Sequence, residues 1–593
     1  MRFPHKRKAV AESWTGNRDS LLPGRRGGKE EGGAANKAAS PAYLQALDIF
    51  HTFVRVPALT KPPGSFILLK GPGGFAILLL AGPLAPDQRR GIETMYFEQT
   101  TPERVGISSR GILDFWDRIE GERLEIHSLM ILRRGKCCCA GWRKPYGPDY
   151  PHGMNSFSKT LTATAVGFAV QEGRLSLEDR LVDIFPDETP ENPSAHLRRA
   201  TVRDLLTMAC GHETESADAS PDWIRAFLRH PFVHEPGAHF FYNTAGTNLL
   251  AAAVRRKTGR NVTAYLRPRL FDPLGIGPVP CHMLADGTEM GGAGMRLRTE
   301  DMAKFMHFLA QKGEWEGRRL LHPAWFEAAC RKQIDTPGDP SRPDGEWGWG
   351  YGFQCWMGSV PGSFRADGAY GQFGFLYPDL ELEIITTAAV QRTQILVDCV
   401  KETLLPAVGG EALPCHPAAD RLFQKMAELT LPALYGDRNP LRESELAGKR
   451  FVCAPGACSS LERLVGGAGL YAVEEGSITR LAFGFEEDAC IWRVGENGEE
   501  KELRAAMNGG FALSECGGRV YAATARWRDF KALEMEIRCV EAIGGVRLIF
   551  RFLANGVTME ADDTLLTSDG FGLFERRIPA LFTATAEPAG EAK

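Results

Sequence analysis

Short apolar runs alternate with segments of helical periodicity between residues 95 and 410. Residues 129–137 predict a strand, a tight turn and the start of a second strand, because apolar residues flank an Arg-Gly-Lys turn. Residues 159–172 place apolar side chains on one helical face. Two apolar runs, at 373–377 and 382–387, predict a further pair of strands. The alternation therefore predicts a mixed α/β domain over residues 95–410.

The segments on either side of this domain differ from it in composition. Residues 1–94 are polar and of low complexity, which predicts a disordered leader, because such a segment cannot bury enough apolar surface to offset the entropy of ordering. This leader is either a true flexible tail or an extension that precedes a native start at Met95. Residues 411–445 predict a linker with a short helix, residues 446–580 a small antiparallel β domain, and residues 581–593 a disordered tail.

Composition limits the partners. The 593 residues carry 70 Lys and Arg against 74 Asp and Glu, which gives a net charge of -4. The chain therefore has no excess of positive charge that would attract nucleic acid or an anionic membrane. The most apolar stretch, residues 75–80, is too short to span a bilayer. The basic residues after Met1 lead into no apolar segment of the kind that a secretory signal contains. These features predict a protein with neither a nucleic-acid partner nor a membrane span, and they indicate no oligomeric state.

The cysteines and histidines predict neither disulfides nor a metal site. The 14 cysteines include no C-x-x-C pair, and the three at 137–139 are adjacent, so that on a strand they would point to alternate faces. Reduced thiols are typical of a cytoplasmic protein, and we expect that location here. The 13 histidines show no H-E-x-x-H or other metal-binding spacing, so we expect no metal and no cofactor.

The strongest chemical signal lies at the start of the helix predicted over 159–172. Ser156 and Lys159 stand three residues apart there, and residues at this spacing share one face of a helix. A serine hydroxyl becomes a good nucleophile when a base takes its proton, and a lysine whose pKa is lowered by burial can be that base. The N–H groups of a helix N-terminus also favour a developing oxyanion. Alone, this spacing favours an N-capping serine beside a surface lysine, and the surrounding sequence has to decide.

The surrounding sequence favours catalysis, because several blocks follow one another in order. They are Ile-Leu-Arg-Arg-Gly-Lys at 131–136, Gly-Trp at 141–142, Asn-Ser-Phe-Ser-Lys-Thr at 155–160 and Glu-Gly-Arg-Leu-Ser at 172–176. This order resembles the serine β-lactamase and penicillin-binding-protein superfamily, in its class C-like branch of β-lactamases, esterases and amide hydrolases. The resemblance implies that Ser156 is the acylated nucleophile. It also implies an antiparallel sheet that is flanked by helices and carries a helical subdomain.

A second block, residues 241–250, resembles the family's Y-x-N segment. The resemblance implies that Tyr242 works with Lys159 as general base and then protonates the leaving group. A phenol can do this if a nearby cation lowers its pKa, and Lys159 is expected to supply that charge. The family's asparagine position falls on Thr244, with Asn243 one residue before it, so both are candidate substrate-binding residues. A threonine hydroxyl can still hydrogen-bond to substrate or to the lysine.

A third block, residues 365–373, is similar to the family's K-T-G or H-x-G strand, which lines the site opposite the nucleophile. Ala366 stands at the position of the family's cation and is followed by Asp367, while Arg365 is expected to point to the other face of the strand. The usual partner of a substrate carboxylate is therefore missing at this position. Gly368 lets substrate approach the main chain, and the N–H of Ala369 is expected to be an oxyanion donor.

Together these motifs predict a serine hydrolase that cleaves a small ester or amide through an acyl-enzyme on Ser156. Lys159 and Tyr242 are the predicted general base and acid. The N–H groups of Ser156 and Ala369 are the predicted oxyanion hole. Because Ala366 is no cation, an esterase or amidase is favoured over a β-lactamase or a D-alanyl-D-alanine carboxypeptidase. The alternative from another class is a catalytically silent binding protein on the same fold.

Overall fold

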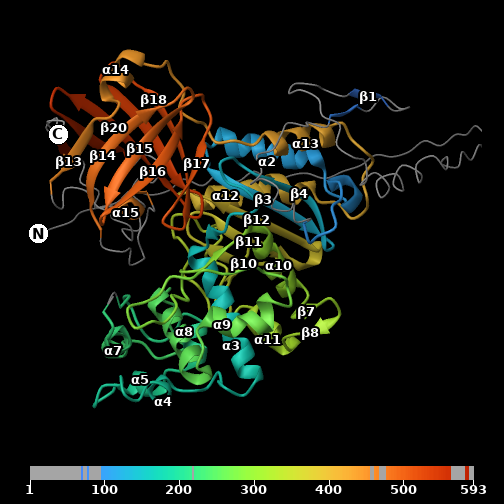
Figure 1. Ribbon diagram of the computed structural model, residues 1–593. Coiled ribbons are helices and arrows are strands. Elements are labelled where there is room, and N and C mark those ends of the chain that lie inside the picture. Colours follow the sequence, from blue (N-terminus) through green and yellow to red (C-terminus); the bar gives the residue numbers. More distant parts are fainter. Residues whose placement is uncertain are drawn as a thin grey trace, which may run out of the picture. The chain divides into compact units, whose positions relative to one another are not determined.

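The computed structural model describes residues 68–70, 76–78, 95–216, 220–454, 460–465, 476–562 and 581–586 (Figure 1). The chain divides into two compact units, residues 1–93 and 94–593. In the first unit, β1 (Leu68–Lys70) and β2 (Ala76–Leu78) pair in antiparallel fashion. The remainder of the segment that we expected to be a disordered leader lies outside the described residues.

An antiparallel sheet forms the centre of the second unit, in the order β4-β3-β12-β11-β10-β9. Its strands are β3 (Ile126–Arg133), β4 (Lys136–Trp142), β9 (Trp356–Met357), β10 (Phe364–Gly368), β11 (Gln372–Tyr377) and β12 (Leu382–Ala388). The apolar run in β3 is continuous because both faces of this strand are buried. Leu129 and Ile131 belong to the core on one face, and Met130 and Leu132 to the core on the other.

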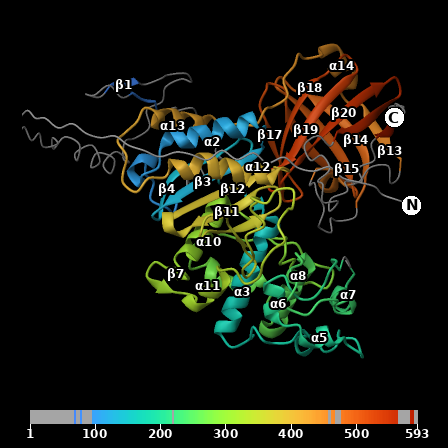
Figure 2. The same ribbon diagram turned by 180° about the vertical axis from the view of Figure 1, so that it is seen from behind.

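Helices cover both faces of this sheet (Figure 1, Figure 2). On one face lie α2 (Ser109–Gly121), α12 (Thr393–Cys399) and α13 (Ala418–Glu428). On the other face lie α3 (Ser158–Gln171) and α10 (Thr299–Ala310). This arrangement positions the start of α3, which carries the predicted nucleophile, next to one end of the sheet.

A helical subdomain packs beside α3. Its helices are α4 (Leu181–Ile184), α5 (Ala195–Arg199), α6 (Val202–Leu206), α7 (Trp223–Arg229), α8 (Thr244–Thr258), α9 (Val262–Leu266) and α11 (Pro323–Ala329). Short strand pairs, β5 (His152–Gly153) with β6 (Arg296–Leu297) and β7 (Glu314–Trp315) with β8 (Arg318–Arg319), complete the domain. The predicted mixed α/β fold with a flanked antiparallel sheet and a helical subdomain is confirmed.

The chain then continues through α14 (Pro440–Leu446) into a second sheet that closes into a barrel, with α15 (Leu461–Val465) between its first two strands in sequence. Its strands are β13 (Arg450–Cys453), β14 (Ile478–Phe485), β15 (Ala489–Glu496), β16 (Glu499–Ala506), β17 (Ala512–Cys516), β18 (Arg519–Trp527), β19 (Ala532–Cys539), β20 (Gly545–Leu553), β21 (Gly556–Asp562) and β22 (Leu581–Ala586). Closure comes from Ala505 and Ala506 of β16, which pair in parallel with β18. Buried side chains such as Trp492, Met535 and Phe550 fill the interior. The predicted C-terminal antiparallel β domain is confirmed.

Two segments differ from the boundaries that the sequence predicts. Helix α13 lies within the expected linker, but Ala418 and Leu422 on its apolar face are buried in the same core as α2. Strand β22 begins at the expected disordered tail, because alternate residues of this Thr-Ala run face the barrel core and its main chain pairs with β13 and β21. Residues 587–593 lie outside the described residues. None of the described helices has the length and apolar character that crossing a bilayer requires.

An ion pair between the buried Arg538 and the partly buried Glu125 joins the barrel to the α/β domain. Arg538 on β19 contacts the carboxylate of Glu125, with Nη2 at 3.2 Å from Oε2, and also pairs with Glu536 at 2.8 Å. Burial alone would raise the pKa of Glu125, but Arg538 and His127 lower it to about 2. His127 in turn contacts His152 at 2.8 Å, and His152 belongs to the strand that leads to Ser156. A charge buried in this way depends on its partner for its solvation.

Replacing Arg538 with methionine is expected to lower the free energy of unfolding by about 3–5 kcal/mol, because the buried Glu536 and the partly buried Glu125 then lose their shared cation. The matched control is Arg493→Met, which breaks an exposed pair with Glu502 (2.9 Å) elsewhere on the barrel, and its cost should be below about 1 kcal/mol. Urea denaturation followed by circular dichroism measures both. If both variants lose the same free energy of unfolding, the Arg538–Glu125 pair does not stabilise the contact between the barrel and the α/β domain.

Candidate active site

Ser156 lies in a short 3-10 turn, Asn155–Phe157, that connects β5 with α3. Asn155 has a φ of 47°, a left-handed conformation that asparagine tolerates better than most residues. Asn155 and Phe157 are buried, whereas Ser156 stays partly exposed. The turn therefore presents one hydroxyl to solvent at the N-terminal end of a buried helix, where main-chain N–H groups gather.

Lys159 is almost fully buried, with 1% of its surface exposed. Its Nζ atom lies within hydrogen-bond distance of three oxygens: Ser156 Oγ at 2.9 Å, Thr244 Oγ1 at 3.2 Å and Gly292 O at 2.7 Å. Burial disfavours the ammonium form and lowers the pKa of Lys159 to about 7, although two nearby carboxylates oppose this shift. A large fraction of Lys159 is therefore neutral near pH 7, and the neutral amine can accept a proton from Ser156.

The two carboxylates are Glu215 and Asp367, which reach the site from different parts of the chain. Glu215 accepts the main-chain N–H of Ala245 at 2.9 Å, at the start of α8. Asp367 on β10 accepts the guanidinium of Arg365 at 2.9 Å and the indole N–H of Trp347 at 3.0 Å, both on Oδ2. No motif in the sequence pointed to Glu215, because its proximity to Lys159 arises only in the folded chain.

Tyr242 lies against Lys159, with the ammonium nitrogen 5.0 Å from the ring centre. Its ring also stacks on Trp356 of β9 at 5.5 Å. The expectation that Lys159 lowers the pKa of the phenol is wrong: burial raises this pKa, and the negative charges nearby raise it further, against a hydrogen bond with Ser156. Tyr242 is therefore a neutral phenol, suited to donate a proton rather than to act as a phenolate base.

Thr244 and Asn243 have different roles at the start of α8. The Asn243 side chain caps the helix, because its Oδ1 accepts the N–H of Gly246 at 2.9 Å while its Nδ2 contacts His212 at 3.1 Å. Thr244 instead contacts Lys159 with its hydroxyl. Of the two candidates, Thr244 lies in the cluster around the nucleophile, and the Asn243 side chain does not.

Gly368 and Ala369 bring the end of β10 against the turn that carries Ser156. A Cβ on Gly368 would lie 2.2 Å from the carbonyl oxygen of Met154, so only glycine permits this approach. The Asn155 side-chain amide donates to the Ala369 carbonyl oxygen at 3.2 Å. These contacts fix the main chain of Ala369 close to Ser156, where the predicted oxyanion donors would have to be.

Gly292 supplies a contact that no motif assigned. Its carbonyl oxygen accepts from Lys159, and its N–H donates to Asn248 Oδ1 at 2.9 Å. A Cβ there would lie 2.8 Å from Thr244 Cγ2 and 2.9 Å from Thr244 O. The adjacent glycines at 291–292 are the signal in the sequence, because such a pair permits close approach of two main chains.

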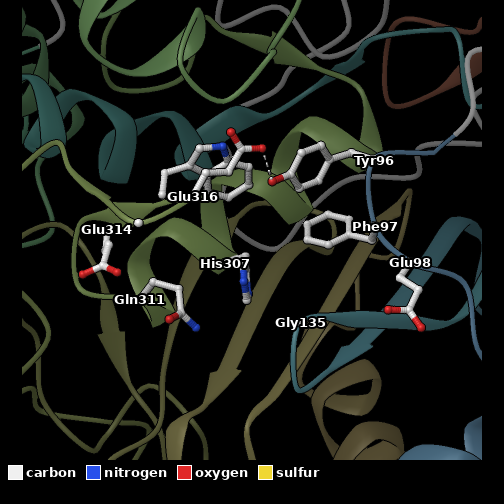
Figure 3. Close-up of a pocket in the computed structure, with 10 residues that line it drawn as sticks. Tyr96, Phe97, Glu98, Gly135, His307, Gln311, Glu314 and Glu316 are labelled. Atoms are coloured by element: carbon white, nitrogen blue, oxygen red, sulfur yellow. Dashed lines mark hydrogen bonds between the residues drawn. The ribbon is translucent and has the colours of Figure 1, made fainter.

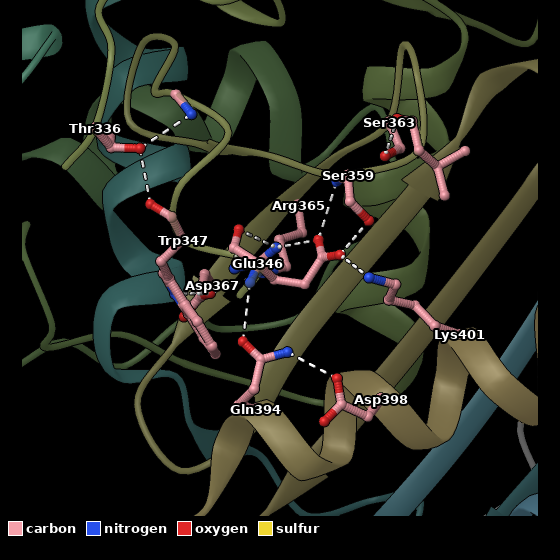
Figure 4. A network of polar contacts seen from close by, with 12 residues as sticks. Thr336, Glu346, Trp347, Ser359, Ser363, Arg365, Asp367, Gln394, Asp398 and Lys401 are labelled. Atoms are coloured by element: carbon pink, nitrogen blue, oxygen red, sulfur yellow. Dashed lines mark hydrogen bonds and ion pairs between the residues drawn. The ribbon is translucent and has the colours of Figure 1, made fainter. Parts of the chain in front are cut away.

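A buried polar network supports Asp367 from behind (Figure 4). Arg365 is 2% exposed and bridges Asp367 to Glu346, whose other oxygen accepts from Lys401 at 2.7 Å. Arg365 also lies over the Trp347 ring, 4.7 Å from its centre. Arg365 and Asp367 share a face of the strand, as alternate residues do, whereas Ala366 between them is buried in the apolar core.

A cavity of about 500 Å³ lies elsewhere on the domain and includes none of these residues (Figure 3). It is lined by residues 96–98, by α10 and by the β7–β8 pair. Tyr96 stacks on Trp315 at 5.0 Å, and the tyrosine hydroxyl donates to Glu316 at 2.9 Å. His307 reaches into this cavity while its Nδ1 contacts Glu383 at 2.8 Å. The cavity is thus separate from the Ser156 cluster.

Among the described residues, no group of three His, Cys, Asp or Glu side chains gathers in a way that could hold a metal ion. The described cysteines are free thiols, including the adjacent Cys137, Cys138 and Cys139, which are buried on both sides of β4.

Part of this chain is similar to known proteins. A model described as Beta-lactamase matches residues 117–394. Lovastatin esterase of Penicillium rubens is 27% identical over 166 residues, a match that covers 23% of this chain and 41% of that enzyme. The 6-aminohexanoate-dimer hydrolase of Paenarthrobacter ureafaciens is 24% identical over 290 residues, covering 44% of this chain and 71% of that enzyme. This chain therefore spans less than half of the esterase that it matches.

Among solved structures, a putative β-lactamase from Bacteroides dorei covers 50% of this chain and 98% of its own, with 15% identity and a TM-score of 0.42. The family match rests on the sequence of residues 117–394, which contains the nucleophile turn, the start of α8 and β10. Residues 117–394 of this chain therefore match the beta-lactamase family.

Proposed function

We propose that this protein is a serine hydrolase that cleaves a small ester or amide through an acyl-enzyme on Ser156. The observation that carries the proposal is the 2.9 Å contact between Lys159 Nζ and Ser156 Oγ, at a lysine whose burial lowers its pKa to about 7. A base of this kind, next to a partly exposed serine, is what activates a hydroxyl nucleophile near neutral pH. The relatives described above, an esterase and a dimer hydrolase, support hydrolysis as the class of reaction.

Acylation uses the groups around Ser156 in turn. Neutral Lys159 takes the hydroxyl proton as the serine oxygen attacks the substrate carbonyl carbon, whose oxygen becomes an oxyanion. The N–H groups of Ser156 and Ala369 bind that oxyanion. Tyr242 gives its phenol proton to the departing oxygen or nitrogen and regains a proton from the Lys159 ammonium. Water then attacks the acyl group with the same groups in the reverse order, and the acid product leaves.

Two alternatives compete with this proposal: a β-lactamase or D-alanyl-D-alanine carboxypeptidase, and a binding protein without catalytic activity. A β-lactamase or D-alanyl-D-alanine carboxypeptidase would bind a substrate carboxylate, but the position of the family's cation is the buried Ala366, which offers no charge to pair with it. A catalytically silent binding protein would not need the contact between Lys159 and Ser156. The ester or amide hydrolase is therefore the function that the site supports best.

The proposed nucleophile is tested by intact-mass analysis after reaction with a fluorophosphonate probe. One adduct is expected on the wild-type protein and none on Ser156→Ala, because only an activated serine reacts readily with this probe. Ser176→Ala, which alters an exposed serine outside the site, is the matched control and should keep the adduct. A folded wild-type protein without an adduct would contradict the mechanism and favour the silent binding protein.

The main-chain approach at Gly368 gives a second test. Gly368→Ala is expected to slow acylation by about 100-fold, because its Cβ would push β10 and the Ala369 N–H away from the oxyanion. The control is Gly121→Ala at the end of α2, where an added Cβ meets no atom within 4 Å. Stopped-flow acylation with p-nitrophenyl acetate gives both rates. If Gly368→Ala acylates as fast as Gly121→Ala, the Ala369 N–H is not an oxyanion donor.

A further inference from the structure

Two carboxylates act on Lys159 and Tyr242, the residues that lie beside Ser156 and form the nucleophile cluster with it. Apart from Lys159 itself, the charged groups that act on its amino group are the carboxylates of Glu215 and Asp367. The same two carboxylates act on the hydroxyl of Tyr242. No positively charged side chain of the described residues stands where the family's cation would be, since Ala366 is there and is buried. A substrate that enters this site therefore meets negative charge on arrival.

Glu215 is the carboxylate whose charge is least compensated. Its Oε1 accepts the N–H of Ala245, the residue after Thr244, whose hydroxyl contacts Lys159. This contact holds the Glu215 carboxylate at the residue that follows Thr244, next to the nucleophile cluster. None of the ion pairs of the described residues includes Glu215, although its charge acts on the amino group of Lys159. The helix N-terminus stabilises the negative charge but does not neutralise it.

Asp367, the second carboxylate that acts on Lys159, lies on β10. Its Oδ2 accepts both the Arg365 guanidinium and the Trp347 indole N–H. Arg365 is 2% exposed and also pairs with Glu346, so its guanidinium is shielded from solvent (Figure 4). The resulting pair is a dipole whose negative end is Asp367. Gly368 follows directly and contacts the main chain at the nucleophile turn.

We propose that this site selects substrates that carry a cationic ammonium group near the scissile ester or amide bond, and that Glu215, assisted by Asp367, binds that ammonium. The inference rests on the proposed function of Ser156 and specifies its substrate class. A carboxylate at the same place is rejected, because it would have to be desolvated next to two groups of its own sign. A neutral substrate is accepted without this gain.

The test compares three p-nitrophenyl esters that differ in charge. The 4-trimethylammoniobutyrate ester is cationic, the 5,5-dimethylhexanoate ester is its neutral isostere, and the glutarate half-ester is anionic. For the wild-type protein, kcat/KM is expected to be at least about 10-fold higher for the cation than for the isostere, and lower for the anion than for both. The preference for the cation should weaken as ionic strength rises, since exposed charges are screened by salt.

Variants assign the preference to residues. Glu215→Gln keeps an oxygen that can accept the Ala245 N–H but removes the charge, so the ratio of cationic to neutral kcat/KM should fall toward 1. Asp367→Asn should lower the ratio less, because Arg365 already offsets part of that charge. The matched control, Glu381→Gln, removes an exposed carboxylate from the turn at the other end of β11 and should keep the wild-type ratio. The ratio is the readout because changes in the basicity of Lys159 affect both esters equally.

The outcomes separate this inference from the proposed function. If wild-type protein forms the fluorophosphonate adduct and hydrolyses the neutral ester, yet shows a ratio near 1 or prefers the glutarate ester, the substrate class is wrong and the hydrolase stands. A ratio above 10 that Glu215→Gln leaves unchanged also overturns the assignment. If neither an adduct nor hydrolysis of any ester is seen, the proposed function fails and this inference fails with it.

Discussion

The amino group of Lys159 is buried with the oxygens of Ser156, Thr244 and Gly292 around it, and each oxygen comes from a different segment of the chain. A lysine in this position is costly, since burial disfavours its charged form and an amine without partners would be unsatisfied. The fold meets that cost by fixing three acceptors at once. The turn before α3, the start of α8 and the glycine loop at 291–292 each supply one of these oxygens. The three segments therefore have to be in place together to satisfy the Lys159 Nζ atom, and this requirement sets the geometry of the site.

Close approach of main chains is the second requirement, and glycines meet it. Gly368 permits the contact between β10 and the nucleophile turn, and Gly292 permits the contact between its loop and Thr244. Both contacts join elements that are far apart in sequence. The barrel adds a further constraint, because the buried Arg538 on β19 pairs with the partly buried Glu125 beside β3. A chain of contacts through His127 and His152 runs from that pair toward Ser156.

The sequence predicts best those features that depend on local spacing. The pairing of Ser156 with Lys159 follows from helical periodicity, and the two-faced burial of β3 follows from its continuous apolar run. The sequence does not show which of Asn243 and Thr244 contacts Lys159. At the start of a helix, a shift of one residue in the position of the N-cap decides which side chain caps the helix and which one faces the site. Glu215 is also not predictable, since its contact with Ala245 depends on how a loop folds back onto α8. Strand β22 escapes prediction for a similar reason: its partners β13 and β21 include a strand more than a hundred residues away.

The central claim is that Lys159 is the base that activates Ser156, and the pH dependence of acylation tests it most directly. The second-order rate constant for reaction of a neutral fluorophosphonate with Ser156 would be measured between pH 5 and pH 10. With a pKa of about 7 for Lys159, the rate should be half-maximal near pH 7, about 10-fold below its maximum at pH 6 and nearly constant above pH 8. A rate that shows no inflection near pH 7 and keeps rising to pH 10, as an unperturbed lysine would give, would contradict the account.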